Sequence, residues 1–495
     1  MHELLSQAAR DYLARDHHPL IDGDRPAAGG QGHLRPTDPA TETPLADIRE
    51  ASAADVDRAV AAASRAAAAP AWRTMPPAAR AAALMRLADA IERDADLLAD
   101  LETICNGTPR AAIRNAILPF VIALTRYYAG WAAQAGGRQV TLSRPGTWHA
   151  YTVREPVGVV AMIVPWNAPI MLTMQKVAPA LAAGCAIVLK PSELTPLTAL
   201  RLGELALEAG IPAGVFNIVP GGAEAGAALV SHRLVDKISF TGSTSVGRAI
   251  AAEAGRSLKR VSLELGGKSP AILLSDADLS RAIPGVAMAI FNNSGQVCAA
   301  ASRLFVHRDI HDAVVEGIAR FAAGLTMGHG LAPETRLGPL ISAAHRERVR
   351  HYIMQGEAQG ARLSFGGSTP DRTGYFLEPA ILTDAAPEMD IVREEIFGPV
   401  LSVMRFDDDD DLEDLARRAN ASEFGLAGSI WSRNVARAQS LAGRLEVGTV
   451  GINTHSLVDP ALPFGGRKAS GIGRECGEEG VLAFTETKSV AVLLD

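Results

Sequence analysis

The chain has few of the residues that mark secreted or membrane proteins. Four cysteines among 495 residues cannot form a disulfide framework, so we expect a protein of the reducing cytoplasm. The richest apolar run, residues 157–164, has the length of a strand and is too short to span a membrane. The first residues lack a basic start followed by an apolar run, so no signal peptide is expected.

Concentrated positive charge is also missing. The 48 Lys and Arg residues are scattered and are outnumbered by 55 Asp and Glu, which gives a net charge of -7. Phosphate backbones need clustered basic residues, so nucleic acid is not expected as a partner. The acidic run at residues 407–411 lacks the spacing of a calcium loop and indicates a solvated turn before a helix at Leu412. No metal site is predicted.

Two nucleotide-binding signatures are incomplete. Residues 266–269 look like the end of a phosphate-binding P-loop, but Ser262 stands where that loop needs its first glycine. A G-x-G-x-x-G motif does not follow the first predicted parallel strand, so an ordinary Rossmann fingerprint is absent. These mismatches exclude a kinase or ATPase, and composition alone does not indicate a dinucleotide.

The periodicity predicts an α/β protein of two or three domains, because 495 residues exceed one hydrophobic core. Strands and helices alternate between residues 157 and 240, which is typical of a doubly wound sheet. The strands are predicted at 157–164, 186–189, 215–219 and 237–240, and the helices at 170–183, at 223–231 and from a Thr195 cap with Pro196 in its first turn to Gly210.

The alternation restarts after Gly267 and indicates a second α/β domain. It predicts strands at 271–274 and 304–307 and helices at 279–292 and 313–322. Before the first sheet, residues 26–32 favour a flexible turn, and helices are expected at 54–102, with breaks at Pro70 and Pro76-Pro77, and at 112–135. A hairpin around Pro145-Gly146 and a terminal strand at 488–494 complete the pattern.

Three separate segments carry reactive side chains. Cys298 follows a polar turn that contains Gly295, Glu264 precedes two glycines, and Asn167 follows Pro165-Trp166. A thiol, a carboxylate and an amide are the nucleophile, base and oxyanion donor of covalent acyl transfer. Taken alone, Cys298 is equally well explained as a small buried residue.

Together these segments resemble the aldehyde dehydrogenase superfamily over nearly the whole chain. The motifs occur in the order of the family and at about its spacing. They are Pro165-Trp166-Asn167, Lys190-Pro191-Ser192-Glu193, Phe240-Thr241-Gly242-Ser243-Thr244, the segments around Glu264 and Cys298, Glu394-Glu395-Ile396-Phe397-Gly398-Pro399, and Pro463-Phe464-Gly465-Gly466.

The resemblance implies an architecture of two doubly wound α/β domains and a small β flap for oligomerisation. It places the NAD-binding domain at residues 1–137 and 156–266, the catalytic domain at 267–464, and the flap at 138–155 and 482–495. In the family the flap joins the sheet of a neighbouring subunit. Pairing protects an apolar terminal strand that would otherwise be a free edge, so a homodimer or homotetramer is expected.

The resemblance also implies a hydrolytic mechanism. Cys298 attacks the aldehyde as a thiolate, and the oxyanion is held by the Asn167 amide and the Cys298 backbone N–H. Glu264 activates water to hydrolyse the thioester. Lys176 matches a lysine near the active site that is tied to proton movement. A base at Glu264 favours water over coenzyme A as the acyl acceptor.

The expected cofactor is NAD. A carboxylate at Glu193 accepts hydrogen bonds from a ribose 2′-hydroxyl and repels a 2′-phosphate, which favours NAD over NADP. The helix that follows Ser243 is expected to meet the pyrophosphate, and Gly222 and Gly226 are expected to mark a nearby turn. The predicted cofactor contacts are Ile163, Pro165, Trp166, Lys190, Ser192, Glu193, Gly222, Gly226, Phe240, Thr241, Gly242, Ser243, Leu265, Gly266, Glu395 and Phe397.

The substrate is expected to be a bulky apolar aldehyde, aromatic or terpenoid. The positions that line the substrate tunnel in the family carry mainly small or apolar residues here. Those positions are Ala168, Met171, Leu172, Gln175, Val297, Ala299 and 454–462. Arg467 is close in sequence and could bind a second carboxylate, so a semialdehyde acid remains an alternative substrate. The alternatives are a coenzyme A-acylating relative, a non-catalytic binding protein on this scaffold, and a thiol hydrolase that uses a Cys–His pair.

Overall fold

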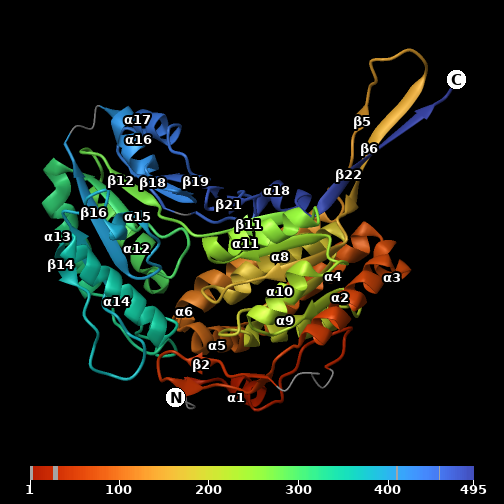
Figure 1. Cartoon of the computed structure of the whole chain (residues 1–495), viewed down its shortest axis with the longest axis horizontal. Coiled ribbons are helices and arrows are strands. Elements are labelled where there is room, and N and C mark those ends of the chain that lie inside the picture. Colours follow the sequence, from red (N-terminus) through yellow and green to blue (C-terminus); the bar gives the residue numbers. More distant parts are fainter. Residues whose placement is uncertain (1–3, 26–31, 408–410, 456) are drawn as a thin grey trace.

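The computed structural model describes residues 4–25, 32–407, 411–455 and 457–495. The predicted turn at 26–32 and the middle of the acidic run therefore lie almost wholly outside the described residues. Two mainly parallel sheets lie side by side, and a narrow three-stranded sheet projects from the first of them (Figure 1). This arrangement confirms the predicted fold class, while the domain boundaries stay a prediction.

The first sheet has the strand order β21-β11-β10-β7-β8-β9, and β21 alone is antiparallel to its neighbour. The side chains of β7 alternate between two cores: Val160 and Met162 face one, and Val159, Ala161 and Ile163 face the other. A strand covered on both faces reads as a continuous apolar run, which is why the sequence predicted it. The strands are β7 (Val159–Ile163), β8 (Ala186–Lys190), β9 (Phe216–Ile218), β10 (Lys237–Thr241), β11 (Arg260–Glu264) and β21 (Gly471–Ile472).

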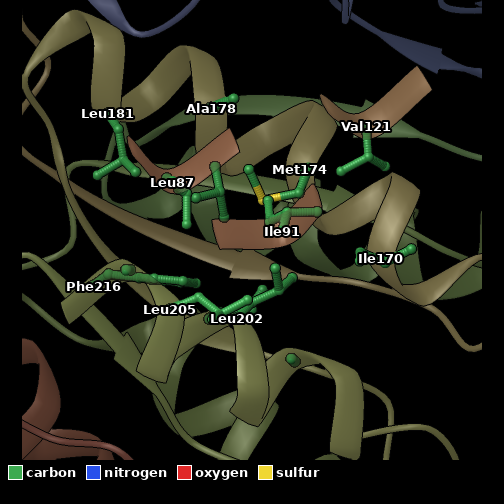
Figure 2. Close-up of a cluster of buried hydrophobic side chains, with 14 of the residues drawn as sticks. Leu87, Ile91, Val121, Ile170, Met174, Ala178, Leu181, Leu202, Leu205 and Phe216 are labelled. Carbon is green, nitrogen blue, oxygen red and sulfur yellow. The ribbon is translucent and has the colours of Figure 1, made fainter. Parts of the chain in front are cut away.

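Helix α8 (Pro169–Ala183) runs through the core on one face of this sheet. Its residues Met174 and Ala178 pack with Leu87 of α4 and Leu202 of α9, as Figure 2 shows. Pro169 begins the helix, and Gly184 ends it in the left-handed conformation. The rigid start of α8 fixes the segment that carries Asn167.

The helices around the first sheet depart from prediction at three positions. An additional break at Asp94 separates α4 from α5. Thr195 does not cap α9 (Leu197–Glu208): the helix begins after Pro196, and the buried Thr195 hydroxyl has no hydrogen-bond partner. The helix predicted at 112–135 is divided by a wider turn at Ile113–Ile117 and ends at Trp131. The remaining helices are α1 (Gln7–Leu13), α2 (Ala53–Ala68), α3 (Pro70–Arg73), α4 (Pro77–Arg93), α5 (Ala95–Asn106), α6 (Arg110–Ala112), α7 (Leu118–Trp131), α10 (Ala223–Ser231) and α11 (Thr244–Arg256).

The second sheet has the order β14-β15-β16-β13-β12-β18-β19, with only β14 antiparallel. The sequence predicted β12 (Pro270–Leu273) and β13 (Arg303–His307) and named none of the others, which are β14 (Arg362–Gly366), β15 (Ala380–Thr383), β16 (Val400–Phe406), β18 (Ala427–Trp431) and β19 (Thr449–Ile452). Its helices are α12 (Leu279–Phe291), α13 (His311–Ala323), α14 (Ala343–Ala358), α15 (Asp390–Arg393), α16 (Leu412–Asn420) and α17 (Val435–Ala442). Asp411 caps α16 by accepting from the Asp414 N–H at 2.8 Å, so the end of the acidic run stands at a positive helix terminus.

The third sheet forms the predicted flap. Strand β22 (Thr485–Leu493) pairs antiparallel with β6 (Trp148–Pro156) over nine residues, and β6 pairs with β5 (Gln139–Val140). The short helix α18 (Gly477–Leu482) precedes β22. Figure 1 shows these strands extending away from the body, with the C-terminus at the far end. No helix among the described residues is long and apolar enough to cross a membrane.

Candidate active site

A strained turn places Cys298. The residues before it, Asn293, Ser294 and Gly295, have positive φ angles of 49°, 55° and 72°. A side chain at Gly295 would put its Cβ 2.1 Å from the Gly398 carbonyl oxygen, so glycine is required there. The Ser294 hydroxyl donates to the Gly338 carbonyl at 2.7 Å and ties the turn to the segment between α13 and α14. Strain of this kind collects at functional sites.

Asn167 lies between β7 and α8, next to the same turn. Its side-chain Nδ2 donates to the Gln296 carbonyl at 3.1 Å, and its own carbonyl accepts from the Asn293 side chain at 2.9 Å. One amide hydrogen is engaged by the Gln296 contact, and an amide nitrogen carries two. The second can serve a ligand oxygen.

Cys298 and Asn167 line a cavity of about 270 Å³. Three rings meet on one side: Trp166 lies edge-on to Phe397 with 5.4 Å between ring centroids, and 5.6 Å from the His345 ring. His345 donates to the Phe397 carbonyl at 2.8 Å, and burial lowers its pKa to about 4, so the ring is neutral. The other lining residues are Pro165, Leu172, Thr241, Gly242, Ser243, Leu265, Gly266, Arg348 and Glu395.

The thiol of Cys298 is held in its protonated form. Burial raises its pKa to about 12, and the carboxyl groups of Glu264 and Glu395 add to the shift. The backbone N–H of Ala299 acts in the opposite direction by stabilising the thiolate. A base or a positive charge near the sulfur must therefore assist its ionisation.

Glu264 ends β11 and does not line this cavity. Burial raises its pKa well above the usual value, the nearby carboxyl of Glu475 raises it further, and Lys176 opposes the shift. One of its oxygens, Oε2, has no hydrogen-bond partner. Lys176 forms a buried ion pair with Glu475, so a chain of ionisable groups leads from α8 to Glu264. A carboxyl with a raised pKa is a stronger base near neutral pH.

A second cavity of about 780 Å³ is lined by residues of α10 and α11. Lys190 donates to the Gly221 carbonyl at 2.6 Å, and its Nζ lies 3.7 Å from Glu193 Oε2. Burial lowers the pKa of Lys190. Ser243, which caps α11, lines the smaller cavity, and Val246 in the first turn of that helix lines the larger one. Gly222 is the cap of α10, but the prediction that Gly226 marks a turn is wrong, because Gly226 lies inside that helix.

The structure gathers most of the predicted site residues around the two cavities. Thirteen are divided between them: Ile163, Lys190, Glu193, Gly222, Gly226 and Phe240 line the larger, and Pro165, Trp166, Thr241, Gly242, Ser243, Leu265 and Gly266 line the smaller. Glu395 and Phe397 join Cys298 and Asn167 in the smaller one. Ser192, Glu264 and Lys176 line neither. Ser192 accepts from the Leu194 N–H at 3.3 Å.

Three neighbours of the site were missed by sequence reasoning. His345 and Arg348 reach the smaller cavity from α14, and Glu475 pairs with Lys176. No local motif marks them, because each is brought to the site by a contact across the chain. Among the described residues no group of three or more His, Cys, Asp or Glu could hold a metal ion.

The chain is similar to known proteins in both sequence and structure. The family model "Aldehyde dehydrogenase family" matches residues 27–490. The phenylacetaldehyde dehydrogenase of Pseudomonas fluorescens is 44% identical over 98% of both chains. The NAD+ complex of an aldehyde dehydrogenase from Bacillus cereus superposes with a TM-score of 0.97 at 43% identity, covering 99% of each chain. A betaine aldehyde dehydrogenase from Staphylococcus aureus with NAD+ gives a TM-score of 0.96 at 34% identity, covering 99% of this chain and 98% of the other.

Proposed function

The chain belongs to the aldehyde dehydrogenase family, and we propose that it works through a thioester on Cys298 and releases a free carboxylic acid. The protein is an enzyme that oxidises aldehydes with NAD. The observation that carries the proposal is the position of Cys298 on the wall of a cavity that Asn167 also lines, with the buried carboxyl of Glu264 close enough to raise the pKa of the thiol.

The first half of the reaction uses the thiol and the amide. The Cys298 sulfur gives its proton to solvent and attacks the carbonyl carbon. A C–S bond forms as the C=O double bond opens, and the carbonyl oxygen becomes an oxyanion. The free amide hydrogen of Asn167 and the Cys298 backbone N–H stabilise that charge. NAD, when bound, would supply the acceptor for the hydride that leaves the aldehyde carbon. The protein is left with an acyl group on the sulfur.

The second half uses Glu264 as the base. Its carboxylate takes a proton from water, the oxygen attacks the thioester carbon, and the C–S bond breaks to return the thiolate and release the acid. Lys176, which its ion pair with Glu475 holds in place, supports this role because its positive charge favours the ionised form of Glu264 that accepts the proton. A base at this position also favours water over coenzyme A as the acyl acceptor.

The residues of the two cavities fit NAD. Thr241 places a buried hydroxyl without a hydrogen-bond partner at the smaller cavity, and Glu193 places a carboxylate on the wall of the larger one. Lys190 and Glu193 would hold the ribose next to the adenine, the start of α11 the pyrophosphate, and Glu395 and Phe397 the nicotinamide ribose and ring.

The finer proposal is a bulky apolar aldehyde. Leu172 lines the cavity at Cys298, and Ala168 at the cap of α8 adds little bulk. Gln175 is buried and points its amide toward the Cys476 sulfur at 3.5 Å. The 44% identity to a phenylacetaldehyde dehydrogenase supports an aromatic substrate.

A second copy of this chain, joined through the flap, is the proposed partner.

The test measures NADH formation by the purified protein with NAD and a panel of short aliphatic, aromatic, terpenoid and semialdehyde substrates. We expect turnover without coenzyme A, with the highest kcat/KM for aromatic or terpenoid aldehydes. Cys298→Ala should lower turnover at least about 10³-fold while NAD still binds. Cys185→Ala is the control, because that thiol is fully buried, contacts the Phe484 carbonyl and lines neither cavity. Full turnover by Cys298→Ala would overturn the proposal.

A further inference from the structure

A loop of the second sheet reaches the residue beside the proposed nucleophile. The loop follows β19 and begins at Asn453, whose side chain is fixed at both ends to Ser432. Asn453 Oδ1 accepts from the Ser432 N–H at 3.1 Å, and Nδ2 donates to the Ser432 carbonyl at 2.9 Å. This double contact anchors the loop to the end of β18. His455, two residues further on, is thereby directed at the Cys298 segment.

Both ring nitrogens of His455 have a partner. Nε2 lies 2.8 Å from the Ala299 carbonyl oxygen, and Nδ1 lies 2.9 Å from the Ser429 hydroxyl. The Trp431 indole donates to the same hydroxyl at 3.2 Å. An indole can only donate and a carbonyl can only accept. Ser429 therefore accepts from Trp431 and donates to Nδ1, and Nε2 carries the proton that it donates to Ala299.

This chain of hydrogen bonds fixes the tautomer of a neutral ring from both ends. Burial lowers the pKa of His455, which favours the uncharged ring. The ring is thus a rigid connector between the sheet strand β18 and the Ala299 carbonyl.

Ala299 is the residue whose backbone N–H stabilises the Cys298 thiolate. On the other side, the Cys298 carbonyl packs against Gly267, where an added Cβ would lie 2.3 Å from the oxygen. The backbone around Cys298 is therefore held between Gly267 and His455, which binds the Ala299 carbonyl. A shift of Ala299 would remove a hydrogen bond from the sulfur without touching any residue of the cofactor cavities.

We propose that His455 is a positioning residue for the nucleophile: its Nε2–H holds the Ala299 carbonyl and so aims the Ala299 N–H at the Cys298 sulfur. The inference deepens the proposed function and rests on Cys298 being the nucleophile. It assigns no charge change to His455. The titration it affects is that of the Cys298 thiol, which faces the carboxyl groups of Glu264, Glu395 and Glu475.

The test compares three substitutions in the full-length enzyme. In His455→Gln the side-chain amide reaches about as far as Nε2 and can still donate to Ala299. In His455→Asn the amide ends near the position of Nδ1, and in His455→Phe the ring remains but both nitrogens are lost. His307→Phe is the matched control, because His307 is a buried ring that contacts the Asp407 carbonyl at 3.1 Å from the far end of β13.

The primary readout is the rate of Cys298 alkylation by iodoacetamide against pH, with the modified peptide identified by mass spectrometry. We expect the midpoint to move up by about one pH unit in His455→Asn and His455→Phe and to stay near that of the native protein in His455→Gln. We also expect kcat to fall roughly tenfold in the first two variants with KM for NAD unchanged.

Two results would overturn the inference. One is an alkylation midpoint that is the same in all three variants, and the other is a shift of equal size in His455→Gln and His455→Asn, since bulk packing does not distinguish the reach of the amide. Failure of the proposed function gives a different pattern, because Cys298→Ala would then keep its turnover whatever the His455 variants do.

Discussion

At the scale of single residues, the site holds two acids whose neutral forms are both favoured. Burial raises the pKa of Cys298 to about 12 and raises that of Glu264 well above its usual value. Each carboxyl near the sulfur makes the thiolate harder to form. The donors that oppose this effect, the Ala299 N–H at the sulfur and Lys176 near Glu264, therefore set how readily the pair exchanges a proton.

Glu264→Gln separates the two halves of the proposed reaction. Glutamine keeps the shape of the side chain but cannot accept a proton from water, so the thioester should form and then persist. We expect a burst of about one NADH per subunit, followed by a steady state roughly 10²-fold slower than in the native enzyme. Rapid-mixing absorbance of NADH measures both phases.

The control for this variant is Glu413→Gln, an exposed carboxylate that pairs with Arg444 far from the cavity. It should leave burst and steady state unchanged. A Glu264→Gln enzyme with native steady-state turnover would remove Glu264 from the mechanism. Loss of the burst itself would instead assign Glu264 to the ionisation of Cys298.

At the scale of elements, a buried carboxyl holds the start of α8. Glu102 of α5 is fully buried, and its two oxygens lie 3.2 and 3.3 Å from the Ile170 N–H in the first turn of the helix. Burial raises the pKa of Glu102 to about 8, although the Ile170 and Thr198 donors lower it. The N-terminus of α8 favours an anion and therefore a lower pKa for Glu102. Burial raises this pKa by more than the helix lowers it.

The pKa of Glu102 predicts a pH-dependent stability. The unfolded chain releases this proton near pH 4.5 and the folded chain near pH 8, so the folded state holds more protons in this window and its stability falls as pH rises. Glu102→Gln removes the titration and retains an oxygen for Ile170. We expect the unfolding free energy of the variant to rise relative to that of the native protein from pH 5 to pH 8, by on the order of 3 kcal/mol over this range, and its Tm to rise accordingly.

Thermal melts of both proteins across this pH range measure the difference. Glu413→Gln serves again as the surface control and should follow the native curve. A constant Tm difference between Glu102→Gln and native protein at all pH values would contradict the prediction, because it would mean that Glu102 does not titrate in this window.

The elements also show where sequence reasoning succeeds. Strands β7 and β8 are buried on both faces and are rich in apolar residues, so they were predicted to within a few residues. Strand β18 is equally buried but reads Ala-Gly-Ser-Ile-Trp, and β11 begins with the exposed Arg260. Their strand conformation comes from neighbouring strands rather than from their own side chains, so local propensity does not reveal them.

The same distinction holds for the site. Cys298, Asn167 and Glu395 sit in contiguous motifs, and the structure brings them to one cavity. His345 and His455 sit in no such motif, because the ring of one contacts Phe397 and the ring of the other contacts Ala299, 156 positions away. Long-range contacts of this kind are created by the topology and leave no periodic signal.

At the scale of the whole molecule, the site lies between the first sheet and the second sheet. The first sheet supplies Asn167 after β7 and Glu264 at the end of β11, and segments bordering the second sheet supply Cys298 before β13 and Glu395 before β16. Motion of one sheet relative to the other would change the cavity. A second copy of the chain that binds the flap would restrain the first sheet, from which the flap extends (Figure 1).

The flap offers the last prediction. Val492 lies near the end of β22 and Leu494 follows that strand directly, and the two side chains are 42% and 64% exposed although they are apolar and lie at a sheet edge. An open apolar edge favours pairing with another chain. Replacing both by Glu places like charges on the two facing copies, so we expect the oligomer to fall to a smaller assembly, measured by size-exclusion chromatography with light scattering.

The matched control is Val435→Glu, which adds a charge at a 52% exposed apolar residue on α17, away from the flap. It should keep the native mass. If the double flap variant also keeps that mass, the flap does not hold the subunits together. If the native protein is itself a monomer, the proposed partner is wrong. A smaller assembly that loses stability while each subunit still binds NAD would show that the flap supports the sheet rather than the cofactor site.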